Sequence, residues 1–269
     1  MSVRRLLPFI PCLVLSSACA VKSFTLPSGP GTPFPEFAAA FDEATRECRD
    51  IKTISVTLSL SGRAGTTRLR GNVDAGFAAP GQMRLEGRAP FGRPVFILVA
   101  RDATNATLLL PRDNRVLRGT PAAAIVEALA GLSLEPDELR SAIAGCGFGT
   151  AASSGGRGYG ADLAVVDLPG ARHYLRREHG RWRLMASVRG PLTIEYRDFS
   201  TSRPATVRML TASNAPQGAS TDLTMKLSDV NINVPLEAEV FNVEIPPSAD
   251  PLTLDELRRA GPLGAAAPR

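Results

Sequence analysis

Histidine and lysine are nearly absent from the sequence. The 269 residues include 2 histidines, 4 cysteines and 1 tryptophan. The two histidines, His173 and His179, are distant in sequence from the cysteines, so we expect no four-ligand zinc site and no other metal centre. A Ser-His-Asp hydrolase holds a histidine beside its nucleophile, often on a Gly-x-Ser-x-Gly elbow, and that elbow is missing here. The sequence therefore predicts a protein that is not an enzyme.

Cofactor motifs are equally weak. The segment 147–152 fits a loose Gly-x-Gly dinucleotide pattern. That motif works only when a strand precedes it and a helix follows, so that the helix N-terminus meets the pyrophosphate. Here a helical pattern precedes the segment and a Gly/Ser-rich loop follows. We expect no bound cofactor.

Arginine carries most of the positive charge. The formal net charge is +5, from 31 basic and 26 acidic residues. Such a balance can indicate nucleic acid or an anionic membrane surface. However, acidic residues are interleaved along most of the chain, and a GC-rich genome encodes arginine where others encode lysine. We expect no nucleic-acid partner.

The N-terminus has the pattern of a targeting segment. Two arginines precede an apolar stretch at 6–15, which is too short to span a bilayer, and small residues then lead into Cys19. This order resembles a bacterial lipoprotein signal, although Ser16 stands where that signal usually has leucine. The resemblance implies a signal peptide at 1–18 and lipidation of Cys19. An ordinary secretory signal cut nearby is the alternative.

Export would also place the remaining cysteines in a compartment where disulfides form. Cys12 lies in the signal and Cys19 would carry the lipid, which leaves Cys48 and Cys146. Disulfides persist in compartments outside the cytoplasm. We expect these two residues to form a disulfide, with two buried free thiols as the alternative.

The mature chain has the length of one large domain. Residues 19–34 are rich in Pro, Gly and Ser, which is typical of a flexible tether. The pattern then predicts a helix at 35–49, about six strands, two short helices near 121–130 and 136–144, and about five to seven further strands. We place the domain at 35–246, followed by a C-terminal tail at 247–269 with a short helix.

Apolar and polar residues alternate in the first three predicted strands. This is typical of an antiparallel sheet with one apolar and one solvated face. The apolar positions could line a ligand cavity or form an ordinary core; they are Ile54, Val56, Leu58, Leu60, Leu69, Val73, Met83 and Leu85. The polar positions include Arg68, Arg70, Arg84 and Arg88. We favour a solvated face with cross-strand pairing to Asp74 and Glu86 over a rim that binds lipid phosphates.

The order of elements resembles the LolA/LolB lipoprotein-carrier superfamily, over most of residues 35–246. The string Met83–Gly92 is similar to that family's strand leading into a Pro-Leu-Gly loop. Asp229–Leu236, followed by Phe241 and by Ile245 with Pro246, is similar to its closing strands. The resemblance implies an α+β fold, in which a curved antiparallel sheet forms an incomplete β-barrel and helices cover its concave face.

The same resemblance implies a function. The concave face would hold acyl chains of lipoproteins or lipids, for transfer or outer-membrane insertion, and a periplasmic carrier would be a partner. Phe91 would be the apolar residue of the acceptor loop, unless it folds back onto the sheet. The protein would be a monomeric envelope lipoprotein that faces the periplasm, most simply at the outer membrane. The alternative is a structural or sensory envelope lipoprotein without a stable lipid ligand.

Overall fold

The fold is built on one large curved sheet. The computed structural model describes residues 24–88, 94–149, 151–200, 203–212 and 220–261. In spatial order the described strands are β1 (Thr32–Pro33), β8 (Gly155–Gly158), β9 (Leu163–Leu168), β10 (Ala171–Glu178), β11 (Arg181–Arg189), β12 (Leu192–Ser200), β13 (Arg203–Thr211), β14 (Thr221–Ile232), β2 (Thr53–Ala64), β3 (Thr67–Ala78), β4 (Gln82–Arg88), β5 (Phe96–Ala100), β6 (Ala106–Leu110), β7 (Arg115–Thr120) and β15 (Asp250–Pro251).

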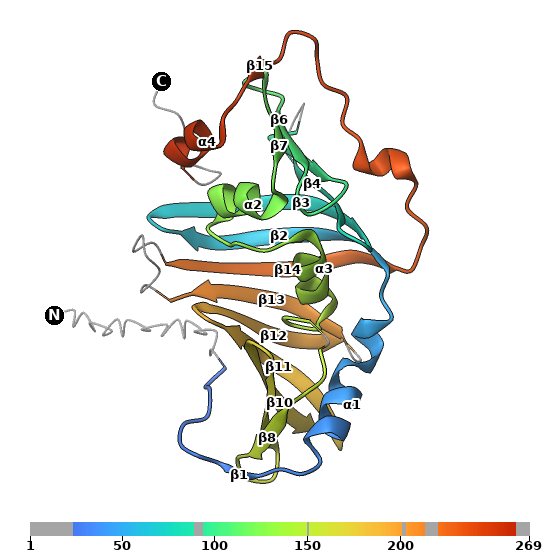
Figure 1. Ribbon diagram of the computed structural model, residues 1–269, viewed down its shortest axis with the longest axis vertical. Helices are drawn as coiled ribbons and strands as arrows, with labels where there is room; N and C mark the ends of the chain where they lie inside the picture. Colours follow the sequence, from blue (N-terminus) through green and yellow to red (C-terminus); the bar gives the residue numbers. More distant parts are fainter. Residues whose placement is uncertain (1–23, 89–93, 150, 201–202, 213–219, 262–269) are drawn as a thin grey trace, which may run out of the picture.

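Neighbouring strands are antiparallel except at one edge, where β15 runs parallel to β7. The sheet is open, because β1 and β15 lie at its two ends. Helices α1 (Phe37–Arg49), α2 (Ala122–Ala130) and α3 (Pro136–Ala144) lie in front of its inner face (Figure 1). This confirms the predicted α+β fold with helices on the concave side of an incomplete barrel. None of the helices in the described ranges is long and apolar enough to cross a membrane.

Local sequence explains where the two inserted helices begin and end. Pro136 occupies the first turn of α3, and Glu135 and Glu138 form a reciprocal capping box. Gly131 and Gly145 end α2 and α3 with φ of 68° and 94°, a left-handed conformation that glycine adopts without steric cost. These signals were visible in the sequence, and both helices lie where they were predicted.

Strand β14 connects the two halves of the sheet. Strands β2–β7 form one half and β8–β13 the other. β14 pairs with β13 on one side and along most of β2 on the other, with Thr221 opposite Ala64 and Ile232 opposite Ile54. The halves therefore meet through a pair of strands that are far apart in the sequence.

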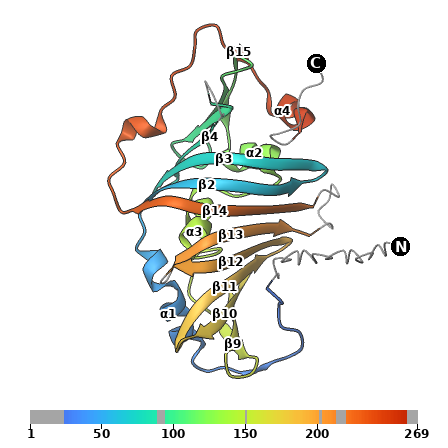
Figure 2. The ribbon, with the colours of Figure 1, turned by 180° about the vertical axis from the view of Figure 1, so that it is seen from behind.

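The segment after β14, residues 233–261, is here called the C-terminal strap. It crosses the outer face near β4, where the guanidinium of Arg84 donates hydrogen bonds to the carbonyls of Val240 and Asn242. Phe241, in a 3-10 turn (Ala238–Phe241), is 1% exposed. The strap then adds β15 to the sheet edge and ends in α4 (Leu254–Ala260), which packs against α2. Figures 1 and 2 show it passing from one face of the sheet to the other.

Candidate functional site

The inner face of the sheet and the helices over it enclose a continuous apolar layer. All eight strand residues predicted to line a cavity face this layer. Six are 0–6% exposed: Ile54, Val56, Leu58, Leu69, Val73 and Met83. Leu60 and Leu85 are half-buried and pack against the same cluster. Side chains of the covering helices, such as Ile125 and Ile143, complete the layer. That these residues hold a ligand stays a prediction.

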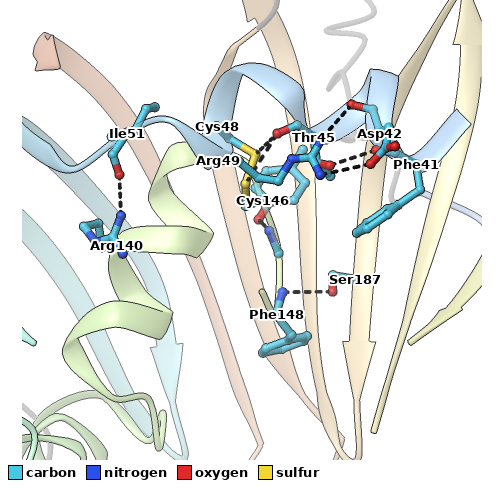
Figure 3. Close-up of a disulfide and its surroundings, with 12 residues drawn as sticks. Phe41, Asp42, Thr45, Cys48, Arg49, Ile51, Arg140, Cys146, Phe148 and Ser187 are labelled. Carbon is cyan, nitrogen blue, oxygen red and sulfur yellow. Dashed lines mark hydrogen bonds and ion pairs between the residues drawn. A yellow bond between two sulfur atoms is a disulfide. The ribbon is translucent and has the colours of Figure 1, made fainter. Parts of the chain in front are cut away.

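A disulfide ties the covering helices together. Cys48 in the last turn of α1 is bonded to Cys146, just after α3, with 5.6 Å between their Cα atoms. The predicted disulfide is therefore present in the structure, and Figure 3 shows it between the two elements. Arg140 of α3 strengthens the same junction by donating a hydrogen bond to the carbonyl of Ile51. Because of these links, α1 and α3 are held as one unit over the sheet.

A buried histidine lies beneath α1. The ring of His173 on β10 stacks on Phe41 of α1, with 5.5 Å between centroids. Neither ring nitrogen has a hydrogen-bond partner among the described residues. Burial lowers the pKa of His173 to about 4, so the ring is neutral near pH 7. The sequence offered no signal for this position, because a single histidine in a strand pattern does not show which helix covers it.

The loop that follows Cys146 packs against His173 and its neighbours on the sheet. The backbone N–H of Gly147 donates to the hydroxyl of Tyr196, at 2.9 Å, and burial raises the pKa of that hydroxyl. Gly147 has φ of +66°, and a Cβ there would lie 2.6 Å from Nε2 of His173. The N–H of Phe148 donates to Ser187 (Figure 3). Only glycine therefore fits where this loop passes over the histidine.

A groove of about 300 Å³ opens beside the disulfide, between α1 and the ends of β11–β13. We call it the α1 groove; its apolar lining residues are Ala44, Cys48, Ala144, Trp182, Leu184, Phe199 and Pro204. Cys48 and Leu184 also belong to the buried core, so the floor of the groove is continuous with the inner apolar layer. Glu43, Arg46 and Arg203 are among the charged residues around it.

The structure shows the predicted cross-strand pairing at one of the four outer arginines, Arg88. Arg84 pairs with Glu86 at 2.7 Å, and Arg88 pairs with Asp74. Arg84 and Glu86 are neighbours on the same strand, β4, whereas Arg88 and Asp74 pair across β4 and β3. Two further predicted positions, Cys19 and Phe91, lie outside the described residues.

Comparisons with known proteins identify the fold. No protein-family model matches the sequence, and no curated protein matches it. A solved LolA superfamily protein, NE2245 from Nitrosomonas europaea, aligns with a TM-score of 0.50 and 10% identity, over 79% of this chain and 98% of that one. A DUF1329 family protein from Desulfovibrio piger has a TM-score of 0.48 at 10% identity, over 76% of this chain and 96% of that one. The fold is thus similar to that of a LolA superfamily protein, as the resemblance of the sequence predicted.

Proposed function

We propose that this chain binds acyl chains of lipoproteins or lipids on the inner face of its sheet, without catalysing a reaction. The continuous apolar layer between that face and α1–α3 is the observation that supports this most. Removing apolar groups from water contributes about 0.8 kcal/mol per methylene, so ten methylenes contribute about 8 kcal/mol. A site of this kind holds a chain strongly, and it releases the chain only to a partner of similar or greater apolarity.

We propose that an acyl chain reaches this apolar layer through the α1 groove. The groove is open, and its floor is formed by residues that belong to the core. Because the disulfide holds α1 to the end of α3, the two helices move together when the layer opens. The incoming chain then takes the place of side-chain contacts between the helices and the sheet.

The proposed cellular setting follows from the N-terminal signal. Removal of residues 1–18 leaves Cys19 as the lipidated first residue of the segment 19–34. The domain at 35–246 and its tail at 247–269 then face the periplasm from the outer membrane. A periplasmic carrier delivers the acyl chain to this protein, which acts as a monomer.

A second candidate is an interaction lipoprotein without a stable lipid. It is favoured by the packing of the inner layer, in which Met83, Leu98 and Ile125 are 0% exposed and fill the space themselves. Native mass spectrometry of the protein released gently from membranes separates the two. Co-purified lipid on the parent protein supports the carrier, whereas a lipid-free mass together with a bound envelope protein supports the second candidate.

Replacing Cys19 with alanine is expected to move the protein from the membrane fraction to the soluble fraction. The described residues contain no helix that could span a membrane, so without the lipid anchor only reversible contacts with the bilayer surface remain. Fractionation of cells, with metabolic labelling by a fatty acid, measures both effects. A parent protein that never incorporates the label would contradict lipidation at this residue.

Replacing Phe91 with glutamate is expected to slow transfer of a fluorescent acyl ligand at least about tenfold, because an acidic group opposes transient contact with an apolar chain. Thr66→Glu is the matched control. Thr66 is exposed in the turn between β2 and β3, and its substitution adds the same charge. Equal transfer rates for the parent and Phe91→Glu would exclude an acceptor role for this loop.

A further inference from the structure

A second apolar cluster lies on the outer face of the sheet, away from the helices. It consists of Val165, Tyr174 and Ala186, with Phe24 packed against it. Phe24 contacts Tyr174 edge-on, at 6.5 Å between ring centroids. Farther along, the hydroxyl of Tyr159 donates to the carbonyl of Gly29, and β1 pairs with β8. The segment 19–34, which the sequence predicted to be a flexible tether, therefore contacts the sheet at Phe24, at Gly29 and through β1.

An open groove of about 630 Å³ adjoins this cluster at β10–β12. We call it the outer groove; the residues that matter here are Phe24, Arg176, Arg183, Met185, Arg197 and Phe199. Leu175 and Leu184 are opposite each other and point into the core. Arg176 and Arg183, the next pair in register, therefore point to the other face, because side chains alternate along a strand. Figure 2 shows the sheet from this side.

Two arginines of the outer groove lie on aromatic rings. The guanidinium carbon of Arg176 is 5.0 Å from the centroid of Phe24, and that of Arg183 is 5.0 Å from the centroid of Phe199. Stacking of this kind positions a guanidinium by its flat face and leaves the N–H groups at its edge available. That arrangement suits bidentate binding of a phosphate.

The acidic residues around the outer groove compensate only part of its positive charge. No ion pair joins Arg176 to another described residue, and Arg183 reaches Glu178 only at 3.9 Å. Asp198 accepts a hydrogen bond from the hydroxyl of Thr206. Arg197 differs from the other two, because it pairs with the buried Glu195. Arg176 and Arg183 are thus the cations that an external anion would meet first.

Chain length places this groove close to the membrane. Cys19 precedes Phe24 by five residues, which span at most about 18 Å when fully extended. A lipid on Cys19 would therefore hold the backbone of Phe24 within about 18 Å of the lipidated residue, with the guanidinium of Arg176 a further 5.0 Å from the Phe24 ring. This step rests on the proposed lipidation.

We propose that the outer groove binds the phosphate groups of anionic phospholipids in the membrane that holds Cys19. Arg176 and Arg183 bind the phosphates, and Phe24 and Phe199 hold the two guanidinium groups in place. The outer face of β10–β12 then rests on the bilayer. The outer groove and the α1 groove share Arg183 and Phe199, so the α1 groove opens at the rim of the surface that rests on the bilayer, while α2 and α3 lie on the opposite face.

Vesicle binding by the mature chain from residue 19, carrying Cys19→Ser to remove the anchor, tests this proposal. The vesicles are phosphatidylcholine alone or phosphatidylcholine mixed with phosphatidylglycerol. We expect binding only to the anionic vesicles, and a loss of at least about 20-fold in affinity for Arg176→Glu/Arg183→Glu, since each arginine near an anionic surface contributes about fivefold. The milder double variant Arg176→Gln/Arg183→Gln should also bind anionic vesicles more weakly than the parent. Its circular dichroism spectrum should be unchanged.

Arg68→Glu/Arg70→Glu is the matched control, because it changes the net charge equally at exposed positions on β3. If the two double variants lose the same amount of vesicle affinity, the binding is general charge attraction and the proposal is wrong. Failure of the parent to bind anionic vesicles, or displacement by inorganic phosphate alone, would also overturn it. Acyl-ligand binding by the single variant Arg176→Glu should stay at the parent level, because Arg176 lines the outer groove but not the α1 groove. If the parent protein binds no acyl ligand, the proposed function is wrong, whereas the proposal that the outer groove binds phospholipid is unaffected.

Discussion

Replacing both Cys48 and Cys146 with alanine is expected to lower the free energy of unfolding by about 2–5 kcal/mol. The disulfide joins residues 98 positions apart, so it closes a long loop and strongly restricts the unfolded chain. Both cysteines are also buried, and alanine leaves no unpaired polar group in their place. Urea unfolding followed by circular dichroism, with parent and variant side by side, measures the difference.

The reduced parent protein is the control for this prediction. It keeps both sulfur atoms and loses only the bond, so its unfolding midpoint should fall toward that of the double variant. A reduced parent that unfolds at the same urea concentration as the oxidised one would show that the bond restricts nothing. In that case α1 would be held by contacts such as that of Phe41 with His173.

Replacing Leu58 with arginine is expected to abolish binding of an acyl ligand and to lower the free energy of unfolding by about 4 kcal/mol or more. Leu58 is 4% exposed on the inner face, opposite Val73, so the new charge would lie in the apolar layer without a partner. Fluorescent fatty-acid titration measures binding, and urea unfolding measures stability.

Two variants keep this prediction open to refutation if Leu58→Arg fails to fold. Ser59→Arg makes the same change one position along β2, on the exposed outer face, and should leave both quantities near the parent values. Leu58→Ala keeps the layer apolar and removes side-chain volume, so acyl binding should persist or tighten. Loss of acyl binding in Ser59→Arg, or no acyl binding by any form, would contradict the carrier hypothesis.

The parts of the fold that depend on local patterns could be predicted. Alternation located β2, β3 and β4 within a few residues, because one face of each strand is buried and the other is wet. Glycine ends and an N-terminal proline located α3. The disulfide followed from the number of cysteines left after export. Each of these signals is carried by residues close together in the chain or by the compartment.

The parts that depend on distant segments could not be predicted. Nothing in the pattern of β14 specifies β2 as its neighbour, since any alternating strand presents the same edge. The stacking of His173 on Phe41, and of Arg176 on Phe24, depends on how a helix and an N-terminal segment cross the sheet. The eight apolar positions were assigned to the correct face. Whether that face opens depends on the energy of helix movement, which a pattern of residues does not contain.

The position of β14 has a consequence for how the newly made chain matures. The first half-sheet, β2–β7, can form once the chain has been made as far as residue 120, because each of its pairings is between sequence neighbours. Its long edge strand β2 then waits for a partner until residues 221–232 arrive. During that interval an exposed strand edge is open to pairing with other chains. A chaperone that shields extended strand edges would therefore matter most until residues 221–232 have been made and have paired with β2.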